Sequence, residues 1–187
     1  MNDRALDNIR YIRETMEQAG SFTAVPGWGG MFMGITALVT ALVAAQMETA
    51  DSWFMAWLVE AAIALTIGGW TMIRKARTIR RILFGPGRKF ALSLCPAMTA
   101  GAILSFALYR EGLFAMIPGA WLLMYGAAVV TGGAYSVRVV PLMGICFMVM
   151  GVVTLFAPFN WANWFMAAGF GGLQIVFGAI IARNYGG

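Results

Sequence analysis

The chain has 187 residues, of which 60% are hydrophobic and 11% are charged, with a net charge of +5 and a mean hydropathy of +0.76. Soluble domains carry about 25% charged residues, so this composition excludes an ordinary soluble domain and predicts a chain that lies in a bilayer. The sequence contains no histidine, which excludes histidine-ligated metal or haem sites, histidine-based catalytic triads and histidine proton relays.

Residues 1–20 differ from the rest of the chain because they mix charges of both signs. Apolar side chains recur there every three or four residues, which predicts an amphipathic helix with an apolar stripe formed by Leu6, Ile9, Ile12 and Met16. Three arginines and four acids give this segment a charge of −1, whereas helices that lie on membranes are usually basic. We therefore expect the stripe to dock on protein, either a basic loop of this chain or a separate partner. A helix lying passively at the membrane surface is the alternative.

Six apolar stretches follow, each close to the roughly 20 residues that a helix needs to cross a hydrocarbon core. They cover residues 28–47, 53–73, 90–109, 113–137, 139–156 and 164–182. The predicted fold class is all-α: a polytopic membrane protein in which residues 1–20 form a cytoplasmic helix and residues 21–187 form one transmembrane domain. Its six helices are expected to pair as three two-helix hairpins. Pro96 and Pro118 are expected to kink the third and fourth spans.

A run of basic side chains without any acid lies between the second and third stretches. This basic cluster consists of Arg74, Lys75, Arg77, Arg80, Arg81, Arg88 and Lys89. Because lysine and arginine accumulate on the cytoplasmic side of membranes, the pattern predicts a multi-pass protein with both termini in the cytoplasm. We expect the basic cluster to contact anionic lipid headgroups or to receive the N-terminal helix. It has no interleaved stacking aromatics, so nucleic acid is not an expected partner.

The inward-running spans share a pattern that indicates an internal repeat. Gly69, Gly133 and Gly178 each stand five residues before an arginine at the end of a span. The second and sixth spans also begin alike, with the letters WFMA at 53–56 and at 164–167. These similarities predict one hairpin used three times in the same direction. Chance similarity among glycine-rich helices is the alternative.

The last two spans carry a family resemblance. The letters LMGICFMVMGVVTLFAP, followed by FMAAGFGGLQIVFGAI, resemble the HdeD-like acid-resistance membrane protein family over residues 140–183. The glycine and proline rhythm of that family is matched by Gly144, Gly151, Pro158, Gly172 and Gly178. The first span departs from it, since it has no proline at the position of Pro158. The resemblance implies six helices in an inner membrane and a stress-related role, and it supplies no catalytic residues.

One charged side chain falls well inside an apolar span. Glu60 stands seven residues after Trp53, and is therefore about 10 Å deep at 1.5 Å per residue. An acid at that depth is costly unless it is paired or protonated. It forms either a proton or cation site, or a structural hydrogen bond across helices or to the outer face. Gln174 and Tyr125 fall near the middle of two other spans, and the three residues are the predicted intramembrane polar site.

The sequence contains no nucleophile elbow, phosphate-binding loop or metal-binding motif. It therefore predicts a protein that is not an enzyme and needs no cofactor or metal. We expect a non-catalytic integral membrane protein that acts through a protein partner or as a homo-oligomer, as an accessory subunit or a sensor. The alternative is a small transporter or channel for protons, cations or solutes that uses an intramembrane carboxylate. An enzyme acting on lipids is a third, less supported class.

Overall fold

The computed structural model describes residues 25–78 and 86–185, and within these ranges every regular element is a helix. The elements are α2 (Gly27–Ala44), α3 (Ala50–Thr78), α4 (Pro86–Arg110), η1 (Phe114–Met116), α5 (Ile117–Gly133), α6 (Val139–Phe156), η2 (Phe159–Trp161), α7 (Ala162–Met166), η3 (Ala167–Leu173) and α8 (Gln174–Tyr185). The amphipathic helix predicted for residues 1–20 lies outside the described residues.

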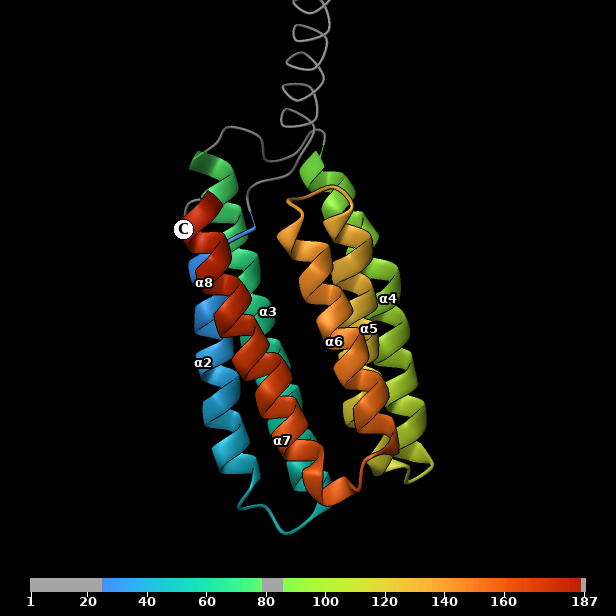
Figure 1. The fold of residues 1–187 in the computed structure, drawn as a ribbon. Coiled ribbons are helices and arrows are strands. Elements are labelled where there is room, and N and C mark those ends of the chain that lie inside the picture. The colour runs from blue at the N-terminus through green and yellow to red at the C-terminus, as the bar shows by residue number, and fades with distance from the viewer. Residues whose placement is uncertain (1–24, 79–85, 186–187) are drawn as a thin grey trace, which may run out of the picture.

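Six helical spans are long and apolar enough to cross a membrane (Figure 1). The sixth is composite, because η2, α7, η3 and α8 follow one another without a break from Phe159 to Tyr185. Large apolar side chains cover the outside of the bundle; Leu65 is 73% exposed and Phe156 is 87% exposed. A helix that is apolar all round requires an apolar surrounding. The predicted all-α class with six spans of membrane-crossing length is confirmed.

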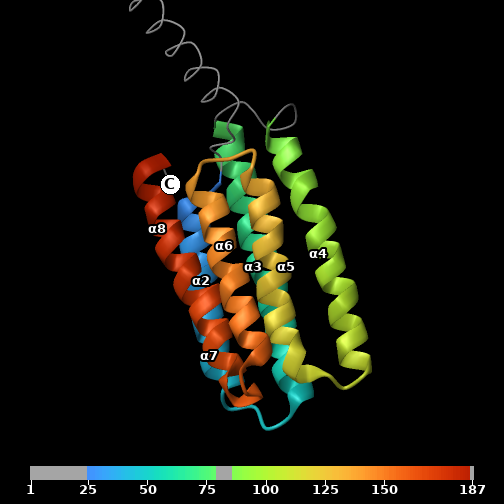
Figure 2. The ribbon, with the colours of Figure 1, turned by 45° about the vertical axis from the view of Figure 1, so that its right-hand side comes forward.

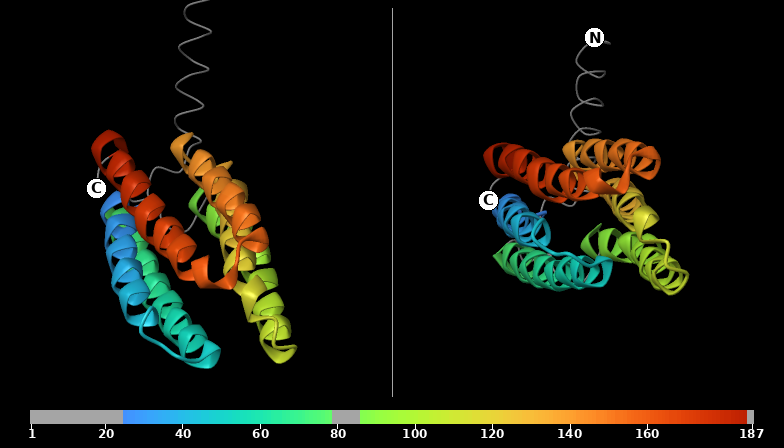
Figure 3. Two further views of the ribbon diagram at one scale, coloured as in Figure 1. Left: turned by 60° about the horizontal axis from the view of Figure 1, so that its bottom comes forward. Right: turned by 90° about the horizontal axis from the view of Figure 1, so that it is seen from below.

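The helices form two groups of three. Seen along the bundle axis they make a ring in the order α2, α3, α4, α5, α6 and the sixth span (Figure 3). The first half consists of α2, α3 and α8, in which α2 contacts both other helices. The second half consists of α4, α5 and α6, in which α5 contacts both others. Figure 2 shows α4 at one edge of the bundle, packed on α5.

The packing differs from three separate hairpins. Helix α6 makes its most extensive contact with α5, and α8 makes its most extensive contact with α2. The two members of the third predicted hairpin, α6 and the sixth span, therefore belong to different halves. Consecutive helices α2 and α3 do pack together, as do α4 and α5. The prediction of three hairpins as the packing units is not confirmed.

The two prolines inside predicted spans have different positions. Pro96 lies inside α4, as expected. Pro118 is the second residue of α5, because the helix begins at Ile117 after a 3₁₀ turn rather than at residue 113. A proline in the first turn replaces an N–H that has no partner in the helix, so it does not kink the helix. The prediction of a kink at Pro118 was wrong.

Helices α5 and α6 are held together by a glycine seam. Glycines recur every seven residues on α5, at positions 119, 126 and 133, and on α6, at positions 144 and 151. A Cβ atom added to Gly126 would lie 2.7 Å from the Gly144 carbonyl oxygen and 2.8 Å from the Met148 nitrogen. The two backbones therefore touch directly, which is how helices gain dispersion energy in lipid.

A second glycine seam joins α2 to the sixth span. A Cβ atom on Gly178 would lie 2.8 Å from both the Gly27 carbonyl oxygen and the Met31 nitrogen, and one on Gly34 would lie 2.7 Å from the Gly171 carbonyl oxygen. Two of the glycines that indicated the repeat, Gly133 and Gly178, thus lie in seams. The third, Gly69 on α3, has no neighbouring atom within 4 Å of the position of a Cβ. The repeat itself stays a prediction.

Substitution within a seam should destabilise the bundle. We expect Gly126→Ala to lower the free energy of unfolding by about 1–3 kcal/mol, because the added methyl group meets backbone atoms that cannot move aside. The matched control is Gly69→Ala, which should leave stability unchanged or raise it by about 0.5–1 kcal/mol. Thermal unfolding in detergent, followed by circular dichroism, measures both. Equal melting temperatures for the two variants would contradict the importance of the Gly126 contact for stability.

Candidate functional site

Glu60 lies on α3, faces α2 and is only 4% exposed. Its carboxyl group is bonded on both sides: Thr36 Oγ1 donates to Oε1 at 2.7 Å, and Thr40 Oγ1 donates to Oε2 at 3.1 Å. The two threonines are four residues apart and so share one face of α2. Each carboxyl oxygen has a hydroxyl partner, which offsets the cost of burying the group.

The threonine partners were not identified from the sequence. Thr36 and Thr40 occur in the letters MGITALVTAL, where two hydroxyl side chains stand one helical turn apart in an otherwise apolar span. That spacing was the available signal, since a buried acid needs donors and two threonines on one helix face can supply them. Glu60 therefore joins α3 to α2 in the first half.

Gln174 and Tyr125 meet across the two halves. Gln174 is the first residue of α8 and is 5% exposed, and its Nε2 atom donates to the Tyr125 hydroxyl on α5 at 2.8 Å. The Gln174 Oε1 atom is buried without a hydrogen-bond partner among the described residues. The structure thus brings together two of the three residues of the predicted polar site. The hydrogen bonds described for Glu60 run instead to α2.

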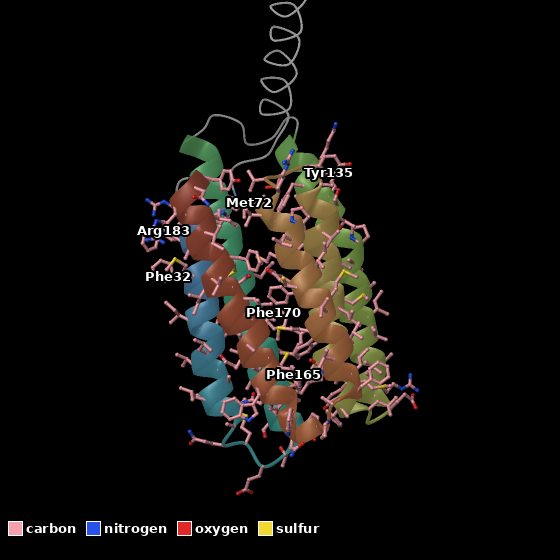
Figure 4. All side chains as sticks on the ribbon, in the orientation of Figure 1. Phe32, Met72, Tyr135, Phe165, Phe170 and Arg183 are labelled. Carbon is pink, nitrogen blue, oxygen red and sulfur yellow. The ribbon has the colours of Figure 1, made fainter. Side chains whose placement is uncertain are left out.

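Aromatic rings surround this pair. The ring centroid of Tyr125 lies 4.8 Å from that of Phe147 on α6 and 5.2 Å from that of Phe170 on η3, and the two phenylalanines are 5.4 Å apart. The tyrosine meets both phenylalanines edge to face. Figure 4 shows Phe170 between the two halves of the bundle. The tyrosine of the polar pair is therefore packed against two apolar rings from two other elements, α6 and η3.

A π-helix precedes Gln174 directly. The seven residues of η3 have the sequence AAGFGGL, in which Gly169 and Gly171 stand two residues apart and so face nearly opposite directions. A Cβ atom on Gly169 would meet Leu122 of α5, whereas one on Gly171 would meet Leu38 of α2. Element η3 is thus in close contact with both halves. π-Helices are rare and occur frequently at functional sites.

A second polar cluster lies at the end of the bundle where α3 begins. Trp53 Nε1 and Trp57 Nε1 both donate to Asn163 Oδ1, at 3.4 and 3.3 Å, and Asn163 Nδ2 donates to the Ala41 carbonyl oxygen at 2.7 Å. The Trp53 ring also stacks on Trp121 of α5 with centroids 6.3 Å apart. This role of Asn163 was not predicted from the sequence. The available signal was a polar amide placed between two tryptophans, Trp161 and Trp164.

The other end of the bundle carries the described members of the basic cluster, and is called the basic end below. Lys75 Nζ donates to the carbonyl oxygens of Val25, at 3.1 Å, and Tyr185, at 3.4 Å. The Arg74 guanidinium lies 4.8 Å from the centroid of the Trp70 ring, and Lys89 is exposed. The helices include Arg77 and Arg88, whose side chains are not described. The rest of the cluster and the predicted docking stripe fall outside the described residues: Arg80, Arg81, Leu6, Ile9, Ile12 and Met16.

Comparison of the chain with protein-family models, with curated proteins and with solved structures finds no match. Within the described ranges, no group of three or more histidine, cysteine, aspartate or glutamate side chains is arranged to hold a metal ion. The polar or charged arrangements considered for function are the Glu60–threonine group, the Gln174–Tyr125 pair and the basic end.

The Asn163 cluster should contribute measurably to stability. We expect Asn163→Ala to cost about 1–3 kcal/mol, because it leaves two indole N–H groups without an acceptor and removes one of the two hydrogen bonds to the Ala41 carbonyl. Asn160→Ala is the matched control, since Asn160 is an exposed asparagine of the same connection. Chemical unfolding monitored by tryptophan fluorescence compares the two variants. A loss of similar size in Asn160→Ala would show that the hydrogen bonds of Asn163 are not the cause.

Proposed function

We propose that this chain is a non-catalytic integral membrane protein that acts through a protein partner, as an accessory subunit or a membrane sensor. The observation that carries the proposal is the junction made by Lys75 at the basic end. The start of α2, the end of α3, the start of α4 and the end of α8 all lie at this end (Figure 1). Both the N-terminal segment and residues 79–85 therefore connect to the bundle there.

Lys75 couples these connections to the first half. Its ammonium group reaches from α3 to the carbonyl of Val25, which precedes α2, and to the carbonyl of Tyr185 at the end of α8. A cation at the C-terminal end of a helix is also favoured by the helix dipole. A partner that binds the N-terminal segment or the basic loop would therefore act on three helices through one side chain.

The proposal includes an orientation. Lysine and arginine gather at the basic end, whereas Arg110 is the one basic residue in the connections at the opposite end, so we propose from the positive-inside rule that the basic end faces the cytoplasm of an inner membrane. Anionic headgroups there would add about 1 kcal/mol for each nearby basic residue. The resemblance of residues 140–183 to the HdeD-like family supports a stress-related role. The stripe predicted on residues 1–20 is the proposed docking surface for the partner.

The stripe provides the test of a protein partner. Ile9→Glu with Ile12→Glu is expected to remove a stoichiometric second protein, because buried charges oppose docking. Native mass spectrometry of protein gently extracted from its own membrane, without overexpression, detects the complex. Asn8→Glu with Gln18→Glu adds equal charge outside the stripe and should keep the partner. Detection of the unmodified protein without a second protein would contradict the proposal. Retention of the partner by both double variants would contradict it as well.

A second candidate function, transport of protons or small cations, is favoured by one observation. Glu60 is a buried carboxyl group with an oxygen environment completed by two threonine hydroxyls. Oxygen atoms of this kind bind protons and hard cations, and carboxyl groups inside membranes frequently mark ion pathways. Under this proposal, α2 and α3 hold the ion between them.

Reconstitution tests the second candidate. If Glu60 carries the ion, Glu60→Gln should reduce proton or monovalent cation flux into proteoliposomes at least about tenfold, because the amide can neither ionise nor release a proton. Glu48→Gln is the matched control, since Glu48 is exposed at the opposite end. Flux that Glu60→Gln leaves unchanged for every ion tested would remove transport from consideration.

A further inference from the structure

The contact between the two halves contains a buried hydrogen-bond acceptor without a donor. Gln174 Oε1 has no partner among the described residues, although the side chain is 5% exposed. Turning the amide over would let Oε1 accept from the Tyr125 hydroxyl and would exchange the positions of Oε1 and Nε2. In the described orientation, one buried polar atom of Gln174 is unpaired. Native proteins rarely bury such an atom without a reason.

Tyr125 supplies the complementary group. Its hydroxyl accepts a hydrogen bond from Gln174 Nε2 at 2.8 Å, and among the described residues no hydrogen bond is donated by this hydroxyl. A tyrosine hydroxyl can both donate and accept. The pair therefore offers one free acceptor and one free donor side by side. A single hydroxyl group on a ligand satisfies both, because it can donate to Gln174 and accept from Tyr125.

The surroundings define the rest of the ligand. Phe147 and Phe170 pack against the Tyr125 ring, and aromatic rings favour edge-to-face contact with a further ring. The one acidic side chain buried in the described spans, Glu60, has both oxygens bonded by threonines. The site thus presents no free charge, and it fits an uncharged aromatic molecule better than an ion.

Binding of such a ring between the halves requires a movement of aromatic side chains. Phe170 stands on the π-helix η3, and its centroid is 5.4 Å from that of Phe147, so one of the two rings must move to make room. Toward the basic end, side chains rather than backbones join the halves, through a cluster that includes Phe90, Val129 and Ile181. Rearranging side chains requires no break in a glycine seam.

We propose that Gln174 and Tyr125 bind the hydroxyl group of a small, uncharged aromatic alcohol, of the phenol or quinol class, that dissolves in the bilayer. Its hydroxyl donates to Gln174 Oε1 and accepts from Tyr125, and its ring packs against Phe147 and Phe170 between the two halves. This site is separate from the basic end and from Glu60, so it stands whether or not a protein partner exists.

Two fluorinated probes test the site. Fluorine NMR of the full chain in lipid nanodiscs compares 4-fluorophenol with 4-fluorotoluene, which has the same ring without the hydroxyl. Empty nanodiscs supply the correction for partition into lipid. We expect the phenol to bind at least about tenfold more tightly than the toluene, since only the phenol satisfies both buried polar groups. Gln174→Met and Tyr125→Phe should each remove that preference.

Matched controls separate the site from general effects. Gln46→Met and Tyr135→Phe make the same changes at exposed positions and should keep the preference. If Gln174→Met fails to fold, Tyr125→Phe decides alone, because it removes a single oxygen atom. Equal binding of the two probes, absence of saturable phenol binding, or a preference that survives Tyr125→Phe would overturn the proposal.

Discussion

Direct contact between helix backbones is the interaction on which the rest of this structure depends. Inside a bilayer the hydrophobic effect does not drive helices together, so their association relies on close packing and on hydrogen bonds. Glycines at intervals of seven residues provide that packing between α5 and α6, and glycines of α2 and the sixth span do so in the other half. Helices α3 and α4 lie outside both seams, and most of their surface is exposed.

Hydrogen bonds between polar side chains add further contacts between the helices. Glu60 attaches α3 to α2 through two threonines, and Asn163 attaches the sixth span to α2 and α3. Between the halves, Gln174 meets Tyr125 and Trp53 stacks on Trp121. Hydrogen bonds of this kind cannot be exchanged for bonds to water in lipid, which makes each partner important for the arrangement of the helices.

The sequence predicted where the membrane-spanning helices lie, but not which helices pack against one another. The fifth span was predicted at residues 139–156, and α6 has those bounds, because Arg138 and Pro158 flank an apolar run of the right length. The pairing of α6 with α5 needed attention to the shared seven-residue glycine spacing, which hydropathy does not measure. The meeting of Gln174 with Tyr125 depends on how two helices are rotated, and the π-helix that sets the rotation of α8 has no periodic signal.

The π-helix changes the direction in which residues of the sixth span face, so that the parts before and after it make different contacts. Before η3, Met166 and Ala162 are buried in the core, whereas after it Gly178 packs against α2. Each residue advances an α-helix by about 100°, so a single deletion within η3 would turn everything beyond it by that angle. Gly178 would then leave α2, and Gln174 would leave Tyr125. In this span, the register of the backbone is as much a part of the site as the side chains it carries.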